Sequence, residues 1–212
     1  MRRVILLAMA VAIICGSASA ETIESTATTP TDGDAYFVIG VSPADSRVTV
    51  SSGEMSKGRF SVPSTLWGGG QTVWTSDDSG FVIGKVHGAT VQAVTKINAY
   101  VHNQTRTGAE KAAVDLLRMA FGLHPSFIRS SFVPCGQKSL TFQVPAGKVM
   151  YITDVKFTAM LGDIDKHDKI APEFSSDLEA ARAFLKMRYP NLADALEQGE
   201  YDLQPVLSPA CY

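Results

Sequence analysis

Short apolar runs separated by turn-forming residues occupy the chain from residue 36 to residue 101. Within several of these runs apolar and polar side chains alternate, as where Val48 and Val50 share one face. Such alternation is typical of a β-strand with one buried face. The pattern predicts strands over residues 36–41, 47–51, 59–62, 71–74, 81–86 and 90–101. Strands this short and closely spaced favour antiparallel sheets arranged as a sandwich or a barrel.

Apolar residues change to helical spacing in two later segments. Thr107 and Glu110 form a capping box at the start of residues 107–122, which predicts a mid-chain helix. Ser176 and Glu179 form a second capping box, and the apolar residues that follow predict a C-terminal helix. A proline ends that pattern, because it cannot continue the hydrogen-bond ladder, and a further short helix is expected over residues 192–197.

A well-defined turn separates residues 139–144 from a second apolar run that begins at Val149. The turn is Pro145-Ala146-Gly147-Lys148, in which proline fixes one φ angle and glycine accepts a positive one. We expect a β-hairpin here, with the return strand reaching about Ala159. The inward side chains of its first strand are Leu140, Phe142 and Val144.

These elements predict an α+β fold, mainly an antiparallel β-sandwich with a mid-chain helix and a C-terminal helix packed on it. Residues 21–34 are polar and rich in threonine, which favours a flexible leader. Residues 35–212 are then expected to form a single β-rich domain, with a helical C-terminal extension at about residues 175–198. A chain of this length can bury a sufficient core.

The first twenty residues have the pattern of a secretory signal peptide. Two arginines precede an apolar run that is too short to span a bilayer, and Ala18-Ser19-Ala20 forms a cleavage site. The pattern predicts export to the periplasm or the medium, with no transmembrane segment after cleavage. A lipid anchor on Cys15 is the alternative, and Ile14 argues against it because lipoprotein processing requires a small residue at that position.

Cleavage would remove two arginines and no acids, so the formal net charge would change from −2 to −4. The chain therefore has no excess of basic residues, and nucleic acid is not an expected partner. Cys135 and Cys211 would remain, and in an oxidising compartment they predict a disulfide bond that closes a loop of about 77 residues. The alternative is a reactive Cys135, which has no histidine or cation beside it in the sequence.

The sequence contains no local motif for catalysis or for a cofactor. The four histidines are not spaced as metal ligands, and there is no P-loop, HExxH or Gly-x-Ser-x-Gly motif. No cofactor is expected. The densest group of acidic residues lies in residues 162–169, where two lysines offset it and favour a solvated connector. The histidines are His87, His102, His124 and His167.

Two tryptophans are candidates for ligand binding. Trp67 and Trp74 flank three consecutive glycines, and their rings could stack on a sugar or a peptide. The competing interpretation is that both rings anchor the core or a loop of the β-rich domain.

Residues 78–86 (DSGFVIGKV) and 142–154 (FQVPAGKVMYITD) resemble small uncharacterised bacterial envelope proteins and lipoproteins with a transthyretin-like or immunoglobulin-like β-sandwich. Residues 180–190 resemble the helical tail of some of those proteins. The resemblance implies a sandwich fold and an envelope location, and it carries over no catalytic residue.

These observations favour an exported, non-enzymatic envelope protein with a binding or structural role. Its partner would be an envelope component or another protein. One alternative is a secreted hydrolase whose site is assembled from distant loops. The other is a carbohydrate- or peptide-binding module that uses Trp67 and Trp74.

Overall fold

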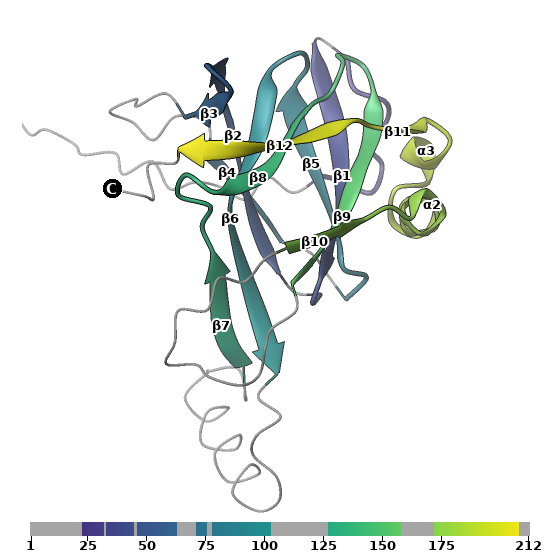
Figure 1. Cartoon of the computed structure of the whole chain (residues 1–212). Coiled ribbons are helices and arrows are strands. Elements are labelled where there is room, and N and C mark those ends of the chain that lie inside the picture. Colours follow the sequence, from purple (N-terminus) through teal and green to yellow (C-terminus); the bar gives the residue numbers. More distant parts are fainter. Residues whose placement is uncertain are drawn as a thin grey trace, which may run out of the picture.

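The computed structural model describes residues 23–31, 33–44, 46–62, 71–75, 78–102, 127–157 and 172–207. Strands dominate this part of the chain (Figure 1). The first six are β1 (Asp34–Ser42), β2 (Arg47–Ser56), β3 (Arg59–Ser61), β4 (Gln71–Thr75), β5 (Phe81–His87) and β6 (Val91–His102). They confirm the six strands expected before residue 102. The later elements are β7 (Phe127–Phe132), β8 (Lys138–Gln143), β9 (Val149–Phe157), β10 (Pro172–Ser175), α2 (Leu178–Arg188), α3 (Pro190–Ala193), β11 (Leu196–Gln198) and β12 (Tyr201–Leu207).

The strands form two sheets. The first has the order β10-β9-β1-β5, and β11 pairs with the same edge of β9 as β10 does. The second has the order β4-β2-β3-β12-β8-β6-β7, with an additional pairing between β2 and β6. Most pairs are antiparallel, whereas β1–β9, β9–β11 and β3–β12 are parallel. The described chain is therefore mostly β with few helices, as expected from the sequence. The pairing between β2 and β6 closes β2, β3, β12, β8 and β6 into a five-stranded barrel, whereas the sequence predicted a sandwich.

β1 lies at the centre of the first sheet and is buried from Ala35 to Val41. On one face of the sheet, Phe37 packs against Phe142 of the second sheet, with ring centroids 5.3 Å apart. On the other face, Phe81 of β5 stacks on Phe184 of α2 at 5.1 Å. A strand covered on both faces has a continuous apolar run in place of alternation, and this explains the sequence of residues 36–41.

The hairpin predicted from residues 139–144 and a return strand from Val149 to about Ala159 is wrong, although its turn is present. Gly147 has a φ of 75°, and the amide of Lys148 donates to the carbonyl of Pro145 at 3.1 Å. The two flanking strands do not pair, because β8 pairs with β6 and β12 whereas β9 pairs with β1, β10 and β11. The turn carries the chain from one sheet to the other. Alternation indicates which side chains are buried, but it does not specify which strand is the neighbour.

Helix α2 packs on the first sheet as expected (Figure 1). Its buried residues are Ala181, Phe184 and Leu185. The cap differs from the predicted capping box by one residue, because the Asp177 carboxylate accepts from the amide of Ala180 at 2.9 Å. The hydroxyl of Ser176 instead donates to Gln198 at 3.2 Å. Aspartate and serine are both strong N-caps, so the pattern alone did not separate the two positions.

The C-terminal segment is not a purely helical extension. α3 ends at Ala193, and the helix expected over residues 192–197 gives way to β11, which pairs with β9. β12 then joins the second sheet between β3 and β8. The three residues of β11 are too few for a period to be read from the sequence. Residues beyond α3 therefore contribute strands to both sheets.

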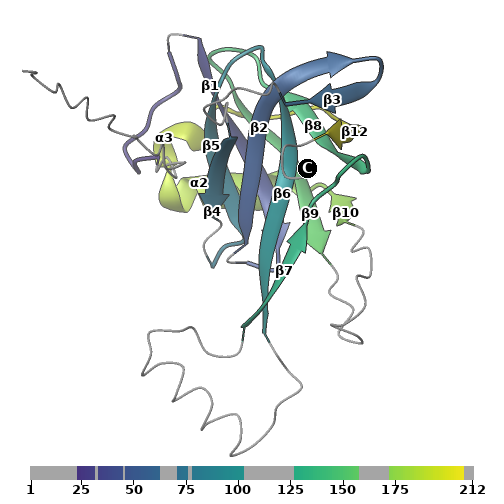
Figure 2. The same ribbon diagram turned by 90° about the vertical axis from the view of Figure 1, so that its left-hand side faces the viewer.

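Residues 23–31, here called the N-terminal strap, belong to the segment expected as a leader, and they lie beside α3 (Figure 2). Ile23 is buried in the main hydrophobic cluster, and Pro30 is also buried. The side-chain amide of Asn191 in α3 donates to the carbonyl of Thr26 at 3.4 Å. The polar composition of the strap concealed its apolar anchor.

Two expected elements, the signal peptide at residues 1–20 and the helix at residues 107–122, lie outside the described residues. Among the helices in the described ranges, none is long and apolar enough to cross a membrane.

Candidate functional site

An open pocket of about 480 Å³ lies between the N-terminal strap and the first sheet. The strap supplies most of its lining, while Asp34, Tyr36 and Lys85 come from β1 and β5. Hydroxyl groups can both donate and accept hydrogen bonds, so this lining suits a polar molecule. The strap contributes four hydroxyls, those of Thr26, Thr28, Thr29 and Thr31.

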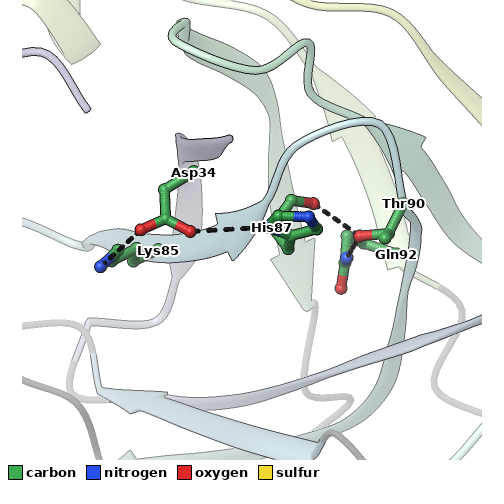
Figure 3. Close-up of polar contacts among 5 residues, drawn as sticks. All are labelled: Asp34, Lys85, His87, Thr90 and Gln92. Atoms are coloured by element: carbon green, nitrogen blue, oxygen red, sulfur yellow. Dashed lines mark hydrogen bonds and ion pairs between the residues drawn. The ribbon is translucent and has the colours of Figure 1, made fainter. Parts of the chain in front are cut away.

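Asp34 is the charged centre at the edge of this pocket. It is the first residue of β1, and the antiparallel register places it opposite His87, with Tyr36 opposite Lys85. The Lys85 ammonium lies 2.7 Å from one carboxylate oxygen of Asp34, and His87 Nδ1 lies 3.6 Å from the other (Figure 3). The hydrogen bond from Lys85 lowers the pKa of Asp34, and His87 adds smaller effects in the same direction. The carboxylate is therefore ionised at neutral pH.

The hydrogen bonds that continue from His87 pass through its backbone and not through its ring (Figure 3). The hydroxyl of Thr90 donates to the His87 carbonyl at 2.6 Å, and Gln92 donates to that hydroxyl at 2.6 Å. The His87 side chain is 69% exposed. Within the described ranges, the contact found for this ring is the one with Asp34.

A second polar cluster lies where β9 meets β10 and α2. The Tyr151 side chain is fully buried, and its hydroxyl accepts a hydrogen bond from the amide of Asp177 at 2.8 Å. One carboxylate oxygen of Asp154 is buried and has no hydrogen-bond partner among the described residues. Burial raises the pKa of Asp154, and the charge of Asp177 raises it further. Burial also raises the pKa of Tyr151.

Of the candidate residues chosen from the sequence, His87 lies beside the pocket, next to Asp34. Trp67 and residues 162–169 lie outside the described residues, as do His124 and His167. Only the backbone of Trp74, in β4, and of His102, in β6, is described. Over the ranges that the structure describes, no group of three or more His, Cys, Asp or Glu residues is arranged to hold a metal ion.

Cys135 lies in an exposed turn beside the end of β12. The amide of Gly136 donates to the carbonyl of Val206 at 2.8 Å, and the amide of Val206 donates to the carbonyl of Gln137 at 3.1 Å. Cys211 follows Val206 by five residues and lies outside the described residues. The disulfide bond therefore stays a prediction, and this backbone pairing supports it.

No protein-family model, curated protein or solved structure matches the chain. Its function is therefore inferred from the residues of the site. Sequence patterns missed the pocket because Asp34 and Lys85 are 51 positions apart and only the β1–β5 register brings them together.

Proposed function

We propose that the protein is exported to the periplasm or the medium, where it acts as a non-enzymatic binding protein of the cell envelope. The binding site is the pocket between the N-terminal strap and the first sheet. The observation that carries this proposal is an open, hydroxyl-rich lining beside the Asp34–Lys85 ion pair. The signal-peptide pattern of residues 1–20 supports export.

The lining points to a small polar ligand such as a saccharide or a short peptide. Lys85 and Asp34 offset each other, so Glu24 leaves the pocket with a net negative charge. Threonine hydroxyls and strap backbone groups can bind the hydroxyls of a sugar or the amides of a peptide. An anionic ligand is disfavoured because it would meet two carboxylates and one ammonium group.

The experiment is a titration of the mature protein with a panel of neutral disaccharides and tripeptides, in which heteronuclear NMR detects binding. Wild type is compared with Lys85→Met and with Lys148→Met, a control in which the lysine also forms an ion pair but lies outside the pocket. We expect saturable shifts in wild type and the control, and at least fivefold weaker binding in Lys85→Met. Equal binding by both variants, or no binding by any panel member, would contradict the proposed site and ligand class.

A secreted hydrolase is the second candidate, and the 3.6 Å contact between Asp34 and His87 is the observation in its favour. An acid–histidine pair is the orienting half of many hydrolytic sites. Turnover of a nitrophenyl ester or a fluorogenic peptide amide by wild type, together with its loss in His87→Ala, would replace the binding proposal with this one.

The finer fold assignment belongs to the same proposal. We assign the two sheets to a β-sandwich of the transthyretin-like or immunoglobulin-like kind, as the resemblance of residues 78–86 and 142–154 implies. The contact between Phe37 and Phe142 across the two sheets supports this assignment.

A further inference from the structure

Asp154 occupies a site that the fold has fitted closely around its carboxylate. In the first sheet it lies between Gly40 of β1 and Ser175 of β10. A Cβ atom on Gly40 would stand 1.9 Å from one carboxylate oxygen of Asp154, and Phe81 also borders this position. A side chain at residue 40 would therefore require the Asp154 carboxylate to move.

One oxygen of this carboxylate lacks a hydrogen-bond donor, although the Tyr151 hydroxyl and the Asp177 amide both hydrogen-bond to the carboxylate. The oxygen without a partner among the described residues, Oδ1, is buried beside Gly40. The Thr153 hydroxyl donates to the carbonyl of Ser175 at 2.7 Å, and the Tyr151 hydroxyl accepts from the amide of Asp177 at 2.8 Å. A buried carboxylate without enough donors is costly when it is ionised.

The charges around Asp154 do not relieve this cost. Burial has the largest effect on the pKa of Asp154 and raises it, and the charge of the Asp177 carboxylate at the start of α2 raises it further. Hydrogen bonds from the Tyr151 hydroxyl and from the Asp177 amide lower it, but they do not outweigh burial. β1, β5 and β10 present groups that do not titrate, namely Gly40, Phe81 and Ser175. The next pair on the same face, Lys156 and Glu173, carries opposite charges.

We propose that Asp154 is a proton-responsive latch that holds the corner between β10 and α2 more tightly against β9 when it is protonated. Proton uptake removes a half-buried charge and its repulsion with Asp177. Loss of the proton restores both costs and loosens the corner where α2 begins.

The direction in which pH changes the stability of the fold follows from the difference between the pKa of Asp154 in the folded and in the unfolded protein. In the unfolded chain Asp154 titrates near its ordinary pKa of 3.8, and in the folded protein this pKa is raised. Below the unfolded value both states are protonated and Asp154 has no effect on stability. As pH rises through the folded value, the unfolded state is favoured tenfold for each unit by which the two values differ.

The test compares wild type with Asp154→Asn, which keeps the shape of the side chain and cannot ionise. Urea unfolding is measured at pH 4.5 and pH 8, and Asp202→Asn, at an exposed aspartate of β12, is the matched control. We expect the unfolding equilibrium constant of Asp154→Asn at pH 8 to be smaller than that of wild type by more than about twofold, and the difference to narrow at pH 4.5. A difference of the same size at both values, or an Asp154→Asn protein that is less stable at pH 8, would overturn the proposal.

Hydrogen exchange of the Asp177 amide in wild type gives a second, local readout that needs no variant. This amide donates to the Tyr151 hydroxyl at the corner that the latch controls. After correction for the intrinsic exchange rate, its protection is expected to be lower at pH 8 than at pH 5. If Asp154→Asn fails to fold, this measurement alone decides, and equal protection at both pH values rules out the latch.

Discussion

Ile23 is predicted to be the anchor that fixes the N-terminal strap and, with it, the wall of the pocket. Its side chain is 9% exposed and belongs to the main hydrophobic cluster, whereas the strap residues Glu24, Ser25 and Thr26 are exposed. Ile23→Ala removes three carbon atoms, worth about 0.8 kcal/mol each before any cavity cost. Because the site lies near one end of the described chain and can partly collapse, we expect a loss of about 2 kcal/mol, at the low end for buried isoleucine.

Urea unfolding of the mature protein measures this loss, with Ser25→Ala as the control. Ser25 is exposed in the same strap and does not line the pocket, so its substitution is expected to stay within about 0.5 kcal/mol of wild type. Limited proteolysis reports whether the strap is released locally before the body unfolds, and Ile23→Ala should be cleaved there faster than wild type. If Ile23→Ala changes neither the free energy of unfolding nor the cleavage rate, the strap is not anchored by this residue.

Three further predictions concern an ion pair, a helix cap and a disulfide bond. Lys85→Met should lower stability by about 0.5 kcal/mol at pH 7, a modest value because the pair is partly exposed. The pKa of Asp34 is lowered in the folded protein, so the ion pair stabilises the fold above about pH 4, and this stabilisation fades as pH falls further. In urea unfolding, the difference in stability between wild type and Lys85→Met should therefore be smaller at pH 3 than at pH 7. Asp177→Ala should lower the free energy of unfolding by about 1 kcal/mol, a larger loss than that caused by Ser176→Ala. A larger loss in Ser176→Ala would instead show that Ser176 is the N-cap, as the sequence predicted. Cys135→Ser should lower stability by on the order of 4 kcal/mol if the predicted loop is closed, and an unchanged thermal midpoint would contradict that bond.

The sequence predicted individual elements better than their partners. β2 could be placed because Val48 and Val50 alternate with polar residues, and β5 because a short apolar run follows a turn. α2 could be placed because Ala181, Phe184 and Leu185 recur at helical spacing. The pairing of β8 and β9 could not be predicted. Two amphipathic strands joined by a tight turn have the same pattern whether they pair in one sheet or face each other across a core.

The candidate site was harder to predict than the fold. Asp34 was assigned to a leader because the residues before it are polar, and nothing in that stretch marks Ile23 as buried except its own side chain. Lys85 lies in a predicted strand and His87 was considered only as one of four histidines without metal-ligand spacing, and only the register of β1 with β5 makes them neighbours of Asp34. Long-range pairing of this kind is set by the packing of whole sheets, which local periodicity does not encode.

Export is the premise on which the binding role, the disulfide bond and the position of the strap near the mature N-terminus all depend. The intact mass of the protein recovered from the periplasm or the medium, measured with and without reduction, tests it most directly. We predict a chain that lacks residues 1–20 and gains the mass of two hydrogens on reduction, as expected for a bond between Cys135 and Cys211. A full-length mass, an added lipid mass on a chain that begins at Cys15, or two free thiols before reduction would contradict the account.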